Sequence, residues 1–373
     1  MAKFDRYFLS QLLALFGFFS LILVLVYWVN RAVSLFDTLI SNGQSAVVFL
    51  EFTALTLPNV IRVVMPIAAF VATIYVTNRL STESELVVVQ STGFSPYRLA
   101  RPVFAFGVIV FVLMSILTHL LVPSSNRQLT LRTAEIAENV AAGLLVEGTF
   151  MHPAKGITFY IREISASGEL QDIFLTDARN TELQTTYTAK LALLVREDTG
   201  PKLLMFDGMA QTLNAKANTL STTQFEDFVF DIGALVPSGD PTKRKPRELS
   251  TPELLSLAPE LLEETGRSAA VFLQEAHERI TQGLVALVAV MTGFAALLVG
   301  GYSRFGIWKQ IVGAVVLLVV METLDNAMSD IAQRDPEAWP VMYVAPALGL
   351  LATFVLLWIS TKPGLFKRRR AQA

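Results

Sequence analysis

Residues 7–30 read YFLSQLLALFGFFSLILVLVYWVN, a stretch without a charged side chain. An α-helix rises about 1.5 Å per residue, so a run of this length crosses the roughly 30 Å hydrocarbon core of a bilayer with some tilt. Comparable uncharged runs occur at 102–126, 280–303 and 338–361. These runs predict four transmembrane helices, two in the first third of the chain and two in the last.

Two less apolar stretches complete the set of spans. One runs from about Phe52 to Asn78 and carries Arg62; the other runs from about Phe305 to Asp325 and ends in Glu322 and Asp325. The chain is 53% hydrophobic and 17% charged, which is typical of a multi-span membrane protein. The absence of cysteine excludes disulfides and thiolate metal sites.

The six spans are divided three and three by one polar insert. We expect residues 1–126 to hold the first three spans, 127–272 an extracytoplasmic domain with a linker helix, and 273–373 the last three spans and a basic tail. With both termini in the cytoplasm, most basic residues near span ends lie inside, as the positive-inside rule requires. These residues are Lys3, Arg6, Arg79, Arg98, Arg101, Arg304, Lys309, Lys362, Lys367, Arg368, Arg369 and Arg370. Such a plan suits a protein that takes a molecule from a bilayer into an aqueous compartment.

The hydropathic period changes to two inside the insert. Ile157, Phe159 and Ile161 alternate with polar or amphipathic residues, and strand-like runs follow at 170–177, 186–196, 202–213 and 220–232. This spacing predicts an antiparallel sandwich or jelly roll, with Asp207-Gly208 as a further turn or a bulge. The domain is either a lid or spacer, or a module that receives an apolar ligand or a partner strand.

The loop between the second and third spans carries the densest local signal. Thr82 and Glu85 have capping-box spacing, and Gly93 with Pro96 supplies a stop, which predicts a short helix within residues 81–93. Such a helix either receives force from a soluble motor or merely closes the loop at the membrane surface. Spacing alone leaves both interpretations open.

The string TESELVVVQSTGF at 82–94, the three-plus-three plan and the β insert resemble the LptF/LptG permeases, which export lipopolysaccharide from the inner membrane of Gram-negative bacteria. Asp5-Arg6-Tyr7, Leu57-Pro58 and Pro66 fit the same family, so the resemblance covers nearly the whole chain. The 82–94 string is closer to the F subunit than to the G subunit.

The resemblance implies a non-enzymatic transport subunit without cofactor, metal or catalytic residues. It implies a companion permease (LptG-like), a cytosolic ATPase dimer (LptB-like), a single-span periplasmic partner (LptC-like) and a periplasmic bridge protein (LptA-like). In the family the loop helix docks on the ATPase through an acidic residue. Glu85 matches that position, and Glu83 lies beside it.

Two arginines near the outer membrane surface are candidate substrate ligands. Arg31 lies at the outer end of the first span and Arg62 in the outer third of the second. A guanidinium binds phosphate in a bidentate manner, and lipopolysaccharide carries phosphates on its lipid headgroup. The resemblance supports this role for Arg31, whereas Arg62 is equally suited to an ion pair with Glu51 or Glu322. Glu275 and Arg279 are spaced for an intrahelical ion pair.

No G-x-x-x-x-G-K-[ST] motif occurs, so ATP that drives this chain must be hydrolysed on another polypeptide. The leading hypothesis is a permease subunit of an ABC transporter. An ion-coupled secondary transporter is the second, although four of the spans lack acidic residues. A membrane anchor with a periplasmic interaction domain is the third, which the uncharged spans do not exclude.

Overall fold

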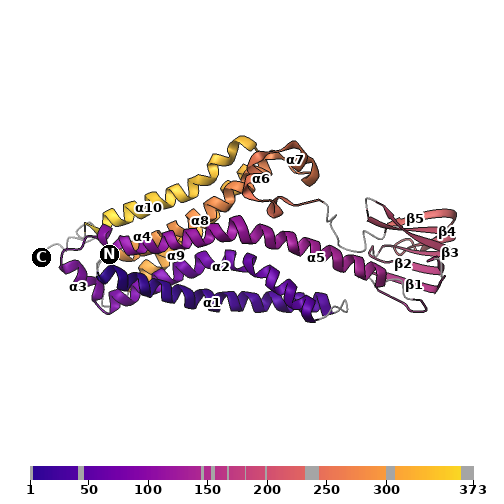
Figure 1. The fold of residues 1–373 in the computed structure, drawn as a ribbon, viewed down its shortest axis with the longest axis horizontal. Helices are drawn as coiled ribbons and strands as arrows, with labels where there is room; N and C mark the ends of the chain where they lie inside the picture. Colours follow the sequence, from indigo (N-terminus) through magenta and orange to yellow (C-terminus); the bar gives the residue numbers. More distant parts are fainter. Residues whose placement is uncertain are drawn as a thin grey trace. The chain divides into compact units, whose positions relative to one another are not determined.

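The computed structural model describes residues 3–40, 46–143, 147–152, 156–165, 168–180, 182–197, 200–231, 243–299 and 307–362. The chain forms two compact units, one of Met1–Arg127 with Arg244–Ala373 and one of Gln128–Lys243. Figure 1 labels their elements. The boundary after Lys243 places residues 244–272 with the helical unit, whereas the sequence pattern assigned them to the insert.

The helical unit contains six helices that are long and apolar enough to cross a membrane, which confirms the six predicted spans. The second span extends beyond both of its predicted ends, and the fifth begins at Trp308 and continues past its predicted end to Ala332. The first helices are α1 (Lys3–Ile40), α2 (Ala46–Thr82), α3 (Glu85–Ser91) and α4 (Pro96–Ile116). A π-helical turn (Leu117–Leu121) leads into α5 (Val122–Gly143), whose residues from Gln128 onward belong to the second unit. The later elements are a 3₁₀ turn (Pro246–Glu248), α6 (Thr251–Ser256), α7 (Pro259–Thr265), α8 (Ala269–Leu298), α9 (Trp308–Ala332), a 3₁₀ helix (Pro336–Tyr343) and α10 (Val344–Ser360).

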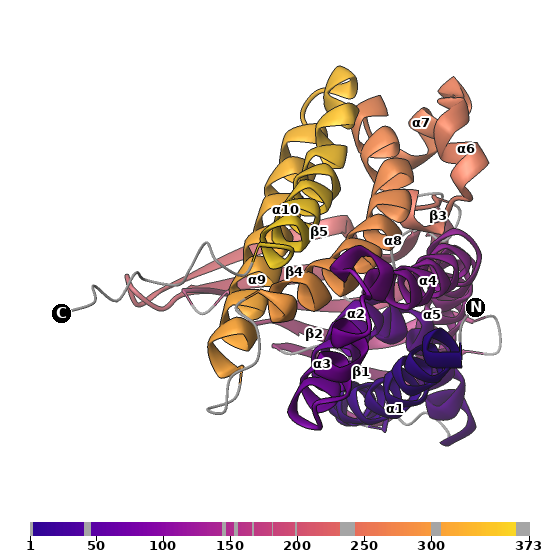
Figure 2. The same ribbon diagram turned by 90° about the vertical axis from the view of Figure 1, so that its left-hand side faces the viewer.

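Helix α8 is the centre of this unit. It packs against α2, α4, α9 and α10, and the end-on view of Figure 2 shows it among them. Of its most apolar eighteen-residue window 83% is buried, against 11% for α1 and for α9. Gly349 of α10 permits the close approach, because a Cβ there would lie 2.4 Å from Val288 of α8. Helices α1 and α9 therefore present apolar surface to lipid or to another membrane subunit.

The second unit holds a five-stranded antiparallel sheet, which confirms the predicted β domain. Its strands follow one another in sequential order, each paired with the next. Their buried side chains form one apolar cluster on the sheet. The strands are β1 (Ile157–Ile164), β2 (Leu170–Asp177), β3 (Leu183–Glu197), β4 (Gly200–Asn214) and β5 (Thr219–Asp231).

One charged residue from each strand forms a row across this sheet, and the alternation of buried and exposed side chains shifts at this row. On β2, Leu170 and Ile173 are both buried although they are three residues apart, so the alternation shifts by one residue at the row. Asp172 and Asp207 adopt positive φ of 49° and 50° there. The β3–β4 register is the same on both sides of Asp207, so Asp207-Gly208 is neither a turn nor an inserted residue. The row consists of Arg162, Asp172, Lys190, Asp207 and Glu226.

Candidate functional site

The connection between α2 and α4 is built around the short helix α3. Helix α2 continues through Thr82, and the chain turns at Ser84, which has a φ of 63°. Gly93, with a φ of 91°, follows α3, as expected for a residue without a Cβ. Ser95 then caps α4 by accepting a hydrogen bond from the Arg98 backbone N–H. The predicted helix stop at Gly93 is present.

The predicted capping box between Thr82 and Glu85 is wrong. The Thr82 hydroxyl donates to the Asn78 carbonyl oxygen at 2.9 Å, as a residue inside a helix does. The residue before α3 is Ser84, which makes no side-chain cap hydrogen bond. Helix α2 extends farther than the motif implied because Leu80, near its end, is fully buried in the apolar core. The Glu85 carboxylate is therefore not used as a cap.

Both candidate docking carboxylates lie at the surface of this connection. Glu83, 51% exposed, forms an ion pair with Arg79 at 3.7 Å, and Glu85 accepts a hydrogen bond from the Tyr7 hydroxyl at 3.4 Å. Leu86 is buried and anchors α3 in the apolar core, whereas Val88 is 60% exposed. The surface of α3 thus offers negative charge beside apolar side chains, which suits a partner with a basic, partly apolar groove.

Of the two candidate substrate ligands, the structure describes the side chain of Arg62 but not that of Arg31. Arg31 is a residue of α1, but its side chain lies outside the described set. Arg62 of α2 interacts electrostatically with Glu278 and Arg279 of α8. Sequence reasoning missed this neighbour, because it depends on the direct packing of α8 on α2. The predicted ion pair of Arg62 with Glu51, which lies on α2 itself, or with Glu322 of α9 stays a prediction.

Glu278 is the acceptor of a polar cluster among α2, α8 and α9. Gln274 and Gln282, one turn away on either side, donate to its two carboxylate oxygens, the second at 2.8 Å. Gln274 also donates to the Ser329 hydroxyl of α9 at 2.8 Å. Arg62 adds positive charge nearby. A carboxylate within a span is costly unless its charge is compensated and its oxygens are hydrogen-bonded. The two glutamines supply the hydrogen bonds, and the nearby charge of Arg62 favours the carboxylate.

Arg279 joins α8 to the segment that enters the helical unit from the insert. Its predicted ion pair with Glu275 is present at 3.3 Å. The guanidinium, 4% exposed, also donates to the Leu249 carbonyl at 2.9 Å, the Thr251 hydroxyl at 3.2 Å and the Pro246 carbonyl at 3.4 Å. The i, i+4 spacing revealed the ion pair, but not these contacts with a segment about thirty residues away.

A second arginine links the short helices α6 and α7. Arg244 donates to both carboxylate oxygens of Glu264, at 2.8 and 2.9 Å, and to Glu253 at 3.1 Å. These hydrogen bonds lower the pKa of Glu264 from 4.5 to about 2. The pKa of Glu253 is also lowered, mainly by hydrogen bonds from Ser250 and to a smaller extent by Arg244.

Glu264→Gln is expected to destabilise the protein in a pH-dependent way. A lowered carboxyl pKa contributes stability above the unfolded-state pKa of 4.5, and this contribution is lost as the pH falls toward 2. Since the pair is partly exposed, we expect a loss of about 1 kcal/mol at pH 7. Thermal unfolding of the purified wild-type and E264Q proteins at pH 7 and near pH 3 measures this. A difference that does not shrink at the lower pH would contradict the role of the pair.

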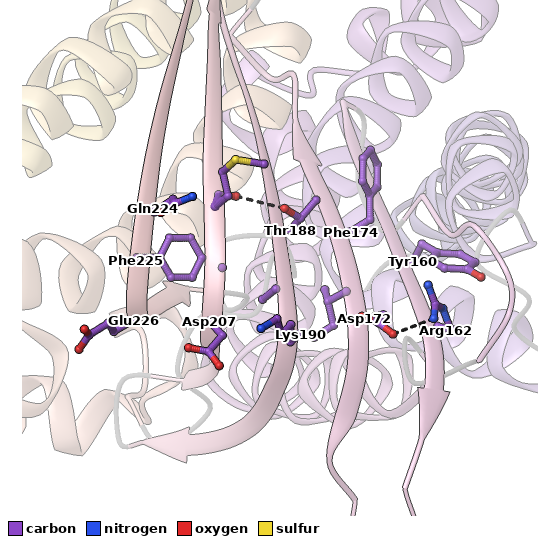
Figure 3. A pocket seen from close by; sticks show the side chains of 14 residues that line it. Tyr160, Arg162, Asp172, Phe174, Thr188, Lys190, Asp207, Gln224, Phe225 and Glu226 are labelled. Carbon is purple, nitrogen blue, oxygen red and sulfur yellow. Dashed lines mark hydrogen bonds and ion pairs between the residues drawn. The ribbon is translucent and has the colours of Figure 1, made fainter.

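The β domain carries a hollow of about 820 Å³ over the charged row (Figure 3). The five charged side chains lie at one level across the five strands, and Arg162 pairs with Asp172 at 3.0 Å. Tyr160 and Phe174 line the neighbouring level. Charged groups make this hollow a poor surface for acyl chains, whereas the apolar cluster of the sheet lies among the buried residues.

Comparison with known proteins places this architecture in a family. The sequence profile described as "Lipopolysaccharide export system permease LptF/LptG" matches residues 6–359. The chain belongs to the LptF/LptG permease family. The predicted family is confirmed by this match, and so is its architecture of six apolar helices and an antiparallel β domain.

Individual LptF and LptG proteins show the same relationship at low identity. The LptF permease of Escherichia coli K12 is 23% identical over 251 residues, which is 65% of this chain and 66% of that protein. The LptG permease of Haemophilus influenzae is 25% identical over 131 residues, 33% of this chain and 34% of that protein. A protein of Rickettsia prowazekii described as uncharacterised is 21% identical over 338 residues, 90% of this chain and 92% of that protein.

Membership of the LptF/LptG family makes this chain a permease of lipopolysaccharide export, with six helices that are long and apolar enough to span a membrane. The LptF match covers about twice as much of the chain as the LptG match, which gives weak support to an F-type subunit. The family match spans both units, so it includes the α3 connection and the β domain.

Proposed function

We propose that this chain is the F-type transmembrane subunit of an ATP-driven lipopolysaccharide exporter in the Gram-negative inner membrane. It pairs with a G-type companion to form a cavity that accepts the lipid from the outer leaflet. ATP is hydrolysed on a separate cytosolic ATPase dimer. The observation that carries the proposal is the family match over residues 6–359, and the exposed apolar surfaces of α1 and α9 supply area for a companion.

The motor engages the chain at the α3 connection. Glu83 and Glu85 dock on the ATPase, and α3 transmits its movement to the spans. Support comes from the exposure of Glu83, from the anchoring of α3 by buried Leu86, and from the basic residues that favour a cytoplasmic position for this loop. Both termini then lie in the cytoplasm and the β domain lies in the periplasm.

A reconstitution experiment tests the function as a whole. Proteoliposomes that contain this chain, its companion permease and the ATPase should release lipopolysaccharide to a soluble periplasmic acceptor only with hydrolysable ATP. Release driven by an ion gradient without ATP would instead identify a secondary transporter. No release under either condition, from a complex that assembles fully, would favour a membrane anchor.

Arg31 and Arg62 are the proposed phosphate ligands of the cavity. Arg62 lies close to Glu278, so its share in substrate binding competes with an ion-pair role. Arg31→Glu should reduce lipopolysaccharide loading by about tenfold or more, because a carboxylate repels phosphate. Arg31→Lys, which keeps the charge, is the matched control. Normal loading of the purified R31E complex would show that the phosphate role is wrong.

The β domain passes the lipid to its periplasmic partners. Among the described strands β5 is paired with β4 and lies at an edge of the sheet, and most of its side chains are exposed, so this edge is the proposed site of strand addition. The single-span partner and the bridge protein are the proposed recipients. A photocrosslinker at Thr222 on β5 should capture one of them in the assembled complex, and capture of neither would exclude this edge.

A further inference from the structure

The first turn of α1 contains a buried carboxylate that the sequence analysis left without a role. The Asp5 side chain is 5% exposed and accepts a hydrogen bond from Arg98 Nη2 at 3.1 Å. Asp5 lies in the first turn of α1, and Arg98 belongs to the first turn of α4. The pair therefore joins two helices that are far apart in the sequence, directly beside the α3 connection.

Arg98 is held in place by its own surroundings. Its backbone N–H is bound to the Ser95 cap of α4, and its guanidinium lies over the Phe94 ring, 5.5 Å from the centroid. A guanidinium fixed in this way is a preorganised partner, so Asp5 meets it without a large further loss of side-chain freedom.

A second polar contact starts two residues further along α1. The Tyr7 hydroxyl donates to Glu85 of α3 at 3.4 Å. Next to these polar contacts, Phe8 of α1 belongs to the same apolar cluster as Leu86 of α3 and Leu99 of α4. The start of α1, helix α3 and the start of α4 are thus joined by two polar contacts and a shared apolar core.

These contacts are needed because α3 is too short to keep its position without packing against other elements. A helix of seven residues is too short to be stable by itself in water, so its place depends on what it packs against. Helix α1, by contrast, has 38 residues, and the most apolar part of it is largely exposed. A displacement of α3 that is passed to α1 therefore reaches a membrane span that packs along α2 and α4 and leaves its remaining apolar face exposed.

We propose that Asp5, Tyr7, Glu85 and Arg98 form an α1 latch, which binds the start of α1 to the α3–α4 connection so that motor movement at α3 is transmitted to α1. Asp5 and Arg98 are positioning residues in this device. The inference rests on the proposed function, since it requires an ATPase that acts at α3. A buried carboxylate that loses its described ion pair is strongly disfavoured, which makes Asp5 the sensitive point.

The test uses the complete complex in nanodiscs, with wild type, Asp5→Asn, the double variant Asp5→Arg with Arg98→Asp, and Lys3→Gln. Lys3 is exposed in the same turn of α1 and serves as the matched control. ATPase co-purification, ATP turnover and lipopolysaccharide released per ATP are measured. We expect the D5N complex to keep the ATPase bound and hydrolysing while release per ATP falls by about tenfold. The charge-reversed pair should recover most of the release, and the Lys3 variant should match wild type.

Unchanged release per ATP in the D5N complex would overturn the latch. So would a charge-reversed complex that assembles but gains nothing over D5N. If the D5N complex does not assemble, Tyr7→Phe decides instead, because it removes only the contact with Glu85, and unchanged release per ATP would again overturn the latch. A wild-type complex that fails to bind the ATPase or to release lipid with ATP would instead refute the proposed function, so the two failures are distinguishable.

Discussion

Glu85→Arg is expected to abolish export, because it places a positive charge where the proposed ATPase surface meets α3. Reversal of a charge in a complementary interface typically costs about 2–5 kcal/mol, which corresponds to a roughly thirtyfold or larger loss of affinity. The change should leave the fold intact, since the carboxylate is not a helix cap and its contact with Tyr7 is a single hydrogen bond at 3.4 Å. Co-purification of the ATPase with the membrane complex and complementation of export in cells measure the effect.

Ser91→Arg is the matched control for this change. It adds the same charge to the last turn of α3, at an exposed position whose hydroxyl donates to the Val88 carbonyl of its own helix. Export and ATPase binding should be retained there. If the E85R variant supports normal export, neither docking by Glu85 nor its contact with Tyr7 is needed for export, and the docking role belongs elsewhere on α3.

Arg279→Met is expected to cause the largest loss of stability. Methionine removes the donors for the Leu249 and Pro246 carbonyls and leaves the buried Glu275 without its intrahelical partner. Removing one member of a buried pair costs about 3–5 kcal/mol. We expect a thermal midpoint lowered by on the order of 10 °C, and reduced yield, in detergent-purified protein.

Arg247→Met provides the comparison for that measurement. Arg247 also pairs with Glu275, at 3.6 Å, but its side chain is 66% exposed. An exposed pair contributes at most about 1 kcal/mol, so this variant should unfold close to wild type. Equal effects of the two substitutions would mean that the contacts of Arg279 with residues 246–251 contribute little.

The elements of the fold followed from hydropathy because membranes and half-buried sheets impose strict periods. Uncharged runs predicted the spans, and the alternation around Ile157 to Ile161 predicted the first strand. The capping-box prediction failed because a local motif does not reveal how far a packed helix continues, and α2 continues through Thr82. The shift of the buried positions at the charged row was not predicted, because the hydropathic alternation does not reveal the positive φ that Asp172 adopts there.

The candidate sites were less predictable because their contacts join distant segments. Glu83 and Glu85 were found from a local string, and the structure describes both. The pair of Asp5 with Arg98 depends on tertiary packing that no spacing rule contains. Arg62 was recognised as an intramembrane charge, but its neighbour on α8 depends on how two spans cross. The roles of both candidate arginines in substrate binding stay predictions.

The polar residues of α8 also bear on how the chain is synthesised. Glu275, Glu278 and Arg279 are acceptable within the unit because α2, α9 and the 246–251 segment surround them. Alone in lipid, this helix would expose its carboxylates and its guanidinium to hydrocarbon. Its stable insertion therefore depends both on α2, which the ribosome has already delivered, and on α9, which is made after it, so the two halves of the helical unit mature together.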